Sequence, residues 1–186
     1  MTGDAAIVAT LAALERAAVP YMIVGSLASN FYGVPRATRD ADLVIDVTGD
    51  VLTALAARLP ATMTLDPQPA FEAVTGTTRY LIGVADTPFV IELFALSDDS
   101  HDRARFARRQ RVSLLGHSAW IATPEDMVIT KLRWIAGGGR TKDRDDVRNI
   151  LAVQGASLDQ GYLAQWTSTH GTAGLLDDIR ASLPGD

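Results

Sequence analysis

The chain has 186 residues, of which 47% are hydrophobic and none is cysteine, and its formal net charge is −5. This length suffices for one domain, or one domain with a helical appendage, that builds its core without disulfides. The lack of cysteine excludes thiolate nucleophiles and cysteine-based zinc sites, and the acidic balance argues against a large sequence-independent DNA footprint. No apolar run approaches the roughly 20 residues of a membrane span, and the amphipathic N-terminal segment does not resemble a signal peptide, so we expect a soluble, cytoplasmic protein without membrane contact.

Hydrophobic periodicity and turn residues predict an α+β fold with a mixed β-sheet flanked by helices and a helical C-terminal part. The expected helices cover residues 4–18, 26–32, 50–59, 101–109, 124–136, 142–152, 158–170 and 172–183. The expected strands cover residues 21–24, 42–47, 63–65, 79–84, 89–95, 112–115 and 119–121. The change of pattern near residue 122 predicts an α/β core over 1–122 and a helical part over 123–186 packed on it.

A Gly-Ser turn ends the first expected strand. Residues 21–24 are apolar, and Gly25 and Ser26 follow them. Glycine lets the backbone turn sharply, and Ser26 is expected to cap the next helix, which Gly33 and Pro35 end. A helix N-terminus offers unpaired N–H groups and a partial positive charge, which favour a phosphate. Alone, such a turn is more often structural than functional.

Two aspartates at alternate positions precede the next apolar run. Asp40 and Asp42 would project from the same face of a strand, because alternate side chains share a face. Neighbouring carboxylates repel each other unless a cation or a proton lies between them, and oxygen ligands suit Mg²⁺ or Mn²⁺. An isolated Asp-x-Asp is usually a solvated strand end. Behind a Gly-Ser turn and a helix-sized spacer, the pair indicates a site for a metal ion and a phosphate.

A third acid, Glu92, interrupts a later apolar strand. A charge in such a strand is unfavourable unless it is paired or binds a metal ion. Two interpretations remain open. Glu92 either pairs with an arginine such as Arg79 across a hairpin, or lies beside Asp40 and Asp42 and completes an acidic cluster.

The order of these motifs resembles the nucleotidyltransferase superfamily with the DNA polymerase β-like fold. Residues 23–47 are most similar to its small prokaryotic AbiEii-like members, which are often grouped with toxin–antitoxin systems. Two later patches agree with this resemblance. One is Pro124-Glu125-Asp126 with Lys131 on the same helix, and the other is the Arg-x-Lys-Asp-x-x-Asp pattern of residues 140–146. The resemblance covers roughly residues 20–152.

The resemblance implies an enzyme of the EC 2.7.7 type that uses Mg²⁺ or Mn²⁺. It would transfer a nucleoside monophosphate from a nucleoside triphosphate, such as ATP, to an acceptor hydroxyl and release pyrophosphate. The implied catalytic and metal-binding residues are Asp40, Asp42 and Glu92. The implied nucleotide-binding residues are Gly25, Ser26, Arg36, Lys131, Asp143 and Asp146. The third acid is often Asp in this group, so Glu92 departs from its pattern by one methylene.

The acceptor and the partners stay open. Acceptors in the superfamily include RNA such as tRNA ends, protein hydroxyls and small molecules such as aminoglycosides. The toxin-like resemblance favours RNA or protein and implies an antitoxin as a partner. The alternative is a catalytically inactive module of the same fold that binds a nucleotide or a partner.

The sequence also contains two groups of basic residues and three histidines. The first group is expected to be a solvated helix face: Arg103, Arg105, Arg108, Arg109 and Arg111. The second group lies near Lys131 and would meet the triphosphate or a polynucleotide: Arg133, Arg140, Lys142, Arg144 and Arg148. The histidines lack metal-ligand spacing and are expected at the surface: His101, His117 and His170.

Overall fold

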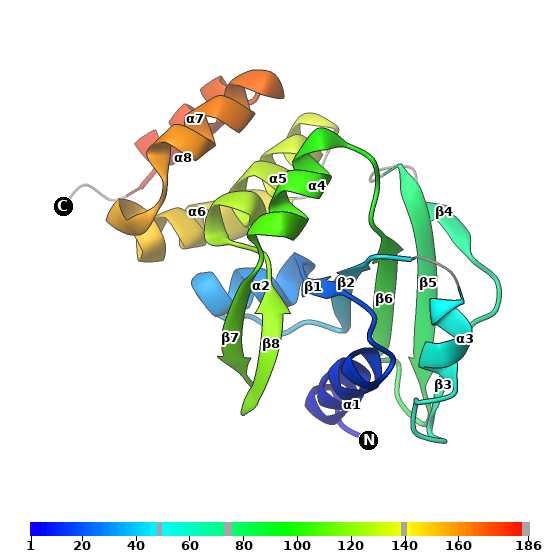
Figure 1. Cartoon of the computed structure of the whole chain (residues 1–186). Helices are drawn as coiled ribbons and strands as arrows, with labels where there is room; N and C mark the ends of the chain where they lie inside the picture. The colour runs from blue at the N-terminus through cyan, green and yellow to red at the C-terminus, as the bar shows by residue number, and fades with distance from the viewer. Residues whose placement is uncertain (48–49, 73–75, 139–140, 184–186) are drawn as a thin grey trace.

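One mixed β-sheet organises the chain in the computed structural model, which describes residues 1–47, 50–72, 76–138 and 141–183 (Figure 1). The strands are β1 (Tyr21–Ile23), β2 (Asp40–Ile45), β3 (Met63–Leu65), β4 (Ala70–Glu72), β5 (Thr77–Val84), β6 (Val90–Ala95), β7 (Gln110–Leu114) and β8 (His117–Ile121). The helices are α1 (Gly3–Arg16), α2 (Gly25–Tyr32), α3 (Val51–Ala56), α4 (Ser100–Arg108), α5 (Pro124–Ala136), α6 (Thr141–Gln154), α7 (Gln160–Thr169) and α8 (Ala173–Ala181). A short 3₁₀ helix, Gly155–Ser157, follows α6.

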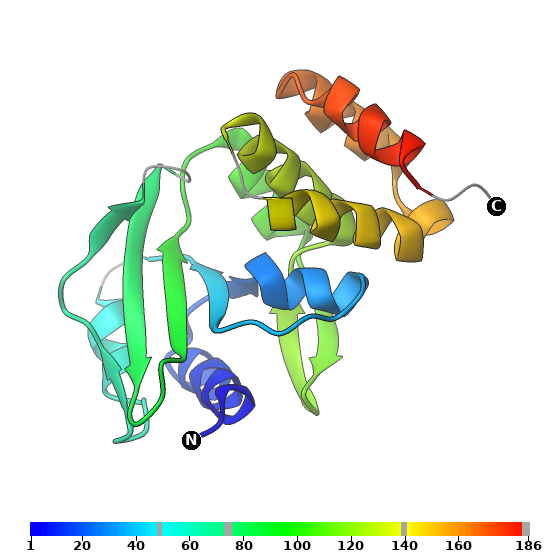
Figure 2. The same ribbon diagram turned by 180° about the vertical axis from the view of Figure 1, so that it is seen from behind.

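The strand order is β3-β5-β6-β2-β1-β8-β7, and β4 adds to the edge of β5. Strand β2 runs parallel to β6 and antiparallel to β1, and β1 meets β8 in a parallel pair. Figures 1 and 2 show α1 and α3 on one face of the central strands and α2 on the other. The last helices, α7 and α8, lie farthest from the sheet. The expected α+β fold with a mixed sheet and a helical C-terminal part is confirmed.

The central strands bury one face almost completely. Ala41, Leu43 and Ile45 of β2 are at most 1% exposed, and so are Ile91 and Leu93 of β6. Each fully buried aliphatic side chain contributes about 1.5–3 kcal/mol to folding. Because side chains alternate along a strand, this apolar face fixes the register and directs the acidic residues to the opposite face.

Several helix ends follow from local chemistry. The Thr123 side chain accepts a hydrogen bond from the Asp126 backbone N–H, and Pro124 occupies the first turn, so α5 begins and ends where the sequence predicts. Helix α1 ends at Arg16, two residues early, and Ala18 has a φ of +55°. Helix α7 begins at Gln160 instead of residue 158, because Asp159 caps it.

Strand β4 was not expected from the sequence. It has three residues, follows Pro69 and leaves Phe71 75% exposed, so it shows no apolar alternation. None of the described helices is long and apolar enough to cross a membrane. The expected division at residue 122 falls just after β8 and stays a prediction.

Candidate functional site

The register between β2 and β6 brings the predicted acids together. Asp42 is paired with Glu92 and Asp40 with Val90, so the three carboxylates leave the same face of the sheet on adjacent strands. The Thr38 hydroxyl donates to Asp40 Oδ1 at 2.6 Å. Glu92 is therefore a neighbour of the two aspartates, as one of the two interpretations requires.

Glu92 also contacts Arg79. Arg79 Nη1 lies 3.3 Å from Glu92 Oε2 across the antiparallel β5–β6 pair. The pairing of Glu92 with Arg79 is thus present as an ion pair, and its relation to Asp42 is that of register partners on adjacent strands.

The Gly-Ser turn lies directly against Asp42. Gly25 has a φ of +62°, and a Cβ placed on it would lie 1.8 Å from Asp42 Oδ2. The Ser26 backbone N–H donates to the Asp42 carboxylate, and the Val24 N–H donates to the Asp42 carbonyl at 2.9 Å. Glycine is required here, because any side chain would displace the carboxylate. The first N–H groups of α2 thus already point toward an anion.

The expected capping role of Ser26 is wrong. Val24 is the N-cap of α2, and no side chain caps this helix. Ser26 lies inside the first turn, where its hydroxyl accepts a hydrogen bond from Arg36 Nη2 at 2.9 Å. Helix α2 begins one residue earlier than predicted because Gly25 adopts the left-handed conformation that the turn needs.

The pKa of Asp42 is raised to about 6, first by burial and then by the charges of Asp40 and Glu92. The nearby Lys131 ammonium and the Ser26 N–H act in the opposite direction. A divalent cation among these oxygens would remove the repulsion that raises this pKa. Oxygen-only donors suit Mg²⁺ or Mn²⁺, so the donor chemistry of Asp40, Asp42 and Glu92 fits such an ion. The three carboxylates share one face of the sheet, but among the described residues the group whose ligand atoms lie within 4.8 Å of one another is Asp99, His101 and Asp102.

Lys131 lies in a buried ion-pair network beside the acids. Its Nζ is 2.8 Å from Asp146 Oδ2 and 3.1 Å from Asp143 Oδ1, and all three side chains are at most 4% exposed. Arg36 donates to both oxygens of Asp146 at 3.0 Å, and the same guanidinium reaches Ser26. Burial opposes ionisation of Asp146, but its hydrogen bonds from Arg36 and Lys131 keep its pKa below the usual range. The network links α5, α6 and the loop after α2 to the first turn of α2.

All the residues that the resemblance assigns to nucleotide binding thus lie together around the N-terminus of α2. The immediate contacts of Lys131 are two carboxylates. Its expected contact with phosphates stays a prediction.

His101 is fully buried, so its expected surface position is wrong. Its Nε2 lies 3.1 Å from Asp126 Oδ1, and its ring packs on Trp166 at a centroid distance of 4.8 Å. Ligand atoms of Asp99, His101 and Asp102 lie within 4.8 Å of one another. The Asp99 side chain caps α4 by accepting hydrogen bonds from the backbone N–H groups of His101 and Asp102, and it also contacts Arg133. Helix capping and this ion pair therefore already use the Asp99 carboxylate.

The first basic group is only partly a solvated face. Arg103 and Arg111 are about half exposed and pair with Asp98 and Glu15. Arg105 is buried, pairs with Asp102 at 2.9 Å and donates to the Thr130 hydroxyl, so for this residue the expectation is wrong.

In the second basic group, two described members meet carboxylates. Arg133 contacts Asp99 and Arg148 contacts Asp145. Arg140 lies outside the described residues. The ion pairs reduce the cationic character of this face.

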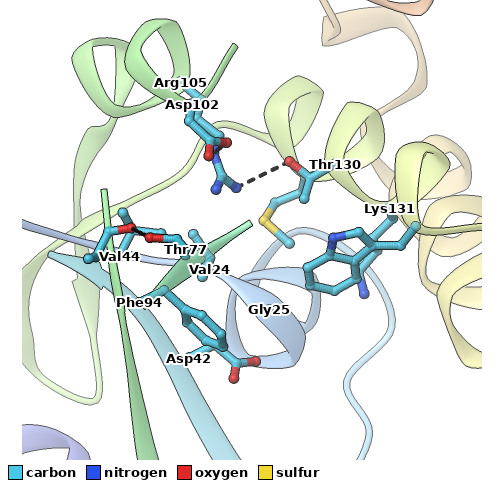
Figure 3. Close-up of a pocket in the computed structure, with 13 residues that line it drawn as sticks. Val24, Gly25, Asp42, Val44, Thr77, Phe94, Asp102, Arg105, Thr130 and Lys131 are labelled. Atoms are coloured by element: carbon cyan, nitrogen blue, oxygen red, sulfur yellow. Dashed lines mark hydrogen bonds and ion pairs between the residues drawn. The ribbon is translucent and has the colours of Figure 1, made fainter. Parts of the chain in front are cut away.

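A hollow opens beside Asp42, between the acidic face of the sheet and α5 (Figure 3). Its lining is mostly apolar and aromatic: Val24, Gly25, Asp42, Val44, Thr77, Phe94, Ala95, Asp102, Arg105, Met127, Thr130, Lys131 and Trp134. Of these lining residues, the sequence predicts Gly25, Asp42 and Lys131 as site residues and does not predict the others. One pattern in the sequence could have identified Phe94 as a site residue. It lies two positions after Glu92, so its side chain projects from the same face of the strand.

No family model matches the sequence, and no curated protein does. The fold is similar to solved nucleotidyltransferase structures. The antibiotic-resistance factor ANT(2'')-Ia in solution has a TM-score of 0.61 at 14% identity, covering 94% of this chain and 96% of that one. Its crystal structure with adenylyl-2''-tobramycin has a TM-score of 0.60 at 16% identity, covering 91% and 99%. An antigenic nucleotidyltransferase-like protein from Paracoccidioides brasiliensis has a TM-score of 0.52 at 18% identity, covering 99% and 95%. At these identities the similarity shows the nucleotidyltransferase fold.

Proposed function

We propose that this chain is a divalent-metal-dependent nucleotidyltransferase. It would move a nucleoside monophosphate from a nucleoside triphosphate to an acceptor hydroxyl and release pyrophosphate. One observation carries the proposal: the carboxylates of Asp42 and Glu92 are paired across adjacent strands, and the N-terminus of α2 touches Asp42. The proposed anion site and the proposed cation site therefore adjoin each other.

Asp40, Asp42 and Glu92 would hold the metal. When bound, Mg²⁺ or Mn²⁺ would neutralise phosphate charge and lower the pKa of the attacking hydroxyl. The pKa of Asp42 is raised mainly by burial and in addition by the charges of Asp40 and Glu92, and a bound cation would offset this second contribution. The three acids are held on two rigid central strands, which limits the reorganisation that binding requires.

The N-terminus of α2 would bind the phosphates of the nucleotide. The backbone N–H groups at Gly25 and Ser26 are oriented by the turn, and the helix dipole adds partial positive charge. Arg36 and Lys131 lie beside this turn, and Asp143 and Asp146 fix their positions while balancing much of their positive charge. Positioning and charge compensation are the main sources of rate in phosphoryl-type transfer.

For the acceptor, we propose that a small-molecule hydroxyl be tested before RNA or protein. The structures of ANT(2'')-Ia, one of which contains an adenylylated aminoglycoside, match this chain over more than nine-tenths of its length. The AbiEii-like grouping, the antitoxin partner and the cytoplasmic location stay predictions from the sequence.

A transfer assay tests the proposal. Purified protein is incubated with α-³²P-labelled nucleoside triphosphates, Mg²⁺ or Mn²⁺, and separate pools of aminoglycosides, total RNA and cell protein. The variant Asp42→Asn removes a proposed metal ligand, and Asp145→Asn is the matched control, because Asp145 is exposed and pairs only at the surface of α6 in the described contacts. Label transfer by wild type and Asp145→Asn, but not by Asp42→Asn, would support the proposal.

The inactive-module alternative makes a different prediction. The Arg79–Glu92 contact favours it, because an arginine on the third acid competes with a metal ion. Metal-dependent nucleotide binding without label in any pool would support that alternative, and transfer by Asp42→Asn at the wild-type rate would contradict the metal assignment.

A further inference from the structure

The hollow beside Asp42 is a slot between two structural layers. On one side, Val44 and Phe94 are register partners on β2 and β6, one step beyond the Asp42–Glu92 pair. On the other side, α5 contributes Met127, Thr130, Lys131 and Trp134, at positions i, i+3, i+4 and i+7. These positions form one face of a helix. The slot is therefore built from rigid elements with aromatic side chains in both layers.

The two ends of the slot differ in chemistry. One end reaches Gly25, Asp42 and Lys131, which belong to the proposed phosphate and metal site. At the other end, Arg105 and Asp102 on α4 form an ion pair at 2.9 Å, and Arg105 Nη1 donates to the Thr130 hydroxyl (Figure 3). Polar atoms with fixed directions thus close an otherwise apolar slot.

We propose that this slot receives the base of the nucleoside triphosphate, with Phe94 and Trp134 contacting its faces and Arg105 and Asp102 facing its polar edge. The inference rests on the proposed function. A flat heterocycle gains from aromatic stacking whatever its identity, whereas an apolar lining disfavours a triphosphate or a polycationic acceptor.

The position of the slot assigns it to the donor nucleotide. Its described lining includes the turn residue Gly25 and the cation Lys131, where the phosphates are proposed to bind. Glu92, two residues before Phe94 on β6, is not among these described lining residues. A nucleotide with its phosphates at α2 would therefore place its base along Val44 and Phe94.

Tryptophan fluorescence tests this placement without catalysis. The chain has three tryptophans, and only Trp134 lines the slot among the described residues. Trp120 packs against Arg109 and Arg111, and Trp166 packs against His101. Wild type is titrated with ATP, GTP, CTP and UTP in Mg²⁺, and with tripolyphosphate, which carries the phosphates without a base.

At least one nucleoside triphosphate should quench the emission, and tripolyphosphate should compete with it without quenching. Trp134→Phe should abolish the quenching, and Trp120→Phe should retain it. Phe94→Ala should raise the Kd of that nucleotide about 5- to 150-fold, the effect of losing one base–aromatic stack, while the Kd of tripolyphosphate stays unchanged. Because Trp134→Phe keeps an aromatic ring, it tests the slot even if Phe94→Ala folds poorly.

Two results would overturn the inference in distinguishable ways. In the first, calorimetry detects nucleotide binding but the Trp134 emission does not change, or Phe94→Ala weakens the binding of nucleotide and tripolyphosphate equally. Either result would show that the base does not bind in the slot and would leave the proposed function intact. Calorimetry that detects no binding of any nucleotide would overturn the proposed function and the base site together.

Discussion

Replacing Asp146 with asparagine should destabilise the protein strongly. The Asp146 side chain is 4% exposed and contacts Lys131 Nζ at 2.8 Å and Arg36 Nε at 3.0 Å. Breaking a buried ion pair by removing one partner typically costs about 3–5 kcal/mol. Lys131 keeps Asp143 at 3.1 Å, and Arg36 is 33% exposed and accessible to water, so we expect the lower end, about 3 kcal/mol.

The measurement is urea unfolding at pH 7, followed by circular dichroism, with Asp145→Asn as the matched control. Asp145 is the preceding residue on α6, is 55% exposed and pairs with Arg148 at the surface. Its replacement should change the unfolding free energy by less than about 0.5 kcal/mol. For a chain of this size the Asp146 variant should also melt about 6–12 °C lower.

The pH dependence gives an independent check. The pKa of Asp146 is lowered in the fold, so its ionised form contributes stability above the unfolded pKa of about 4, and this contribution is lost as pH falls through the folded pKa. The difference between wild type and Asp146→Asn should therefore shrink in acid. A difference below about 1 kcal/mol at pH 7, or one that does not change with pH, would refute the reasoning.

Three further changes probe the acidic site. Without metal, Asp42→Asn should stabilise the fold by about 1–3 kcal/mol at pH 8, because the raised pKa of Asp42, about 6, means that its ionised form is disfavoured in the fold. In urea titrations this gain should shrink as pH falls from the folded toward the unfolded pKa and vanish well below pH 4, where aspartate is protonated in both states, and a loss of stability at pH 8 would contradict it. Gly25→Ala should destabilise by about 2–4 kcal/mol in the same assay, since alanine is strained at a φ of +62° and its Cβ meets Asp42, and a neutral result would show that the turn can relax. Arg79→Gln should lower the Mg²⁺ concentration for half-maximal nucleotide binding about 2- to 5-fold, because Arg79 competes with the metal ion for Glu92. A higher Mg²⁺ concentration for half-maximal binding would mean instead that Arg79 supports the site.

Local patterns in the sequence predicted most of the elements, because their causes act within a few residues. Thr123 and Pro124 specify where α5 begins, and alternation in β2 places Asp40 and Asp42 on one face. The register that pairs Asp42 with Glu92 joins positions 50 residues apart, and it depends on which strands become neighbours. For this reason the sequence left two interpretations of Glu92 open, and the fold shows an ion pair with Arg79 and a register pairing with Asp42.

Errors arose where a long-range partner overrode local preference. Ser26 has the side chain of a helix cap, but Arg36 engages its hydroxyl and Gly25 starts the helix. His101 has no apolar neighbours that signal burial, and it is buried because Asp126 and Trp166, distant in sequence, surround its ring.

The sequence by itself determined the alternation of strands and helices, the turn at Gly25 after the first strand and the acids at the start of the second. Tertiary structure alone decided that Lys131 lies between Asp143 and Asp146, and that Phe94 faces Trp134's helix across a slot next to Asp42. The physical reason is that backbone conformation and face selection depend on neighbours in the chain, whereas ion-pair partners and cavities depend on how whole elements pack.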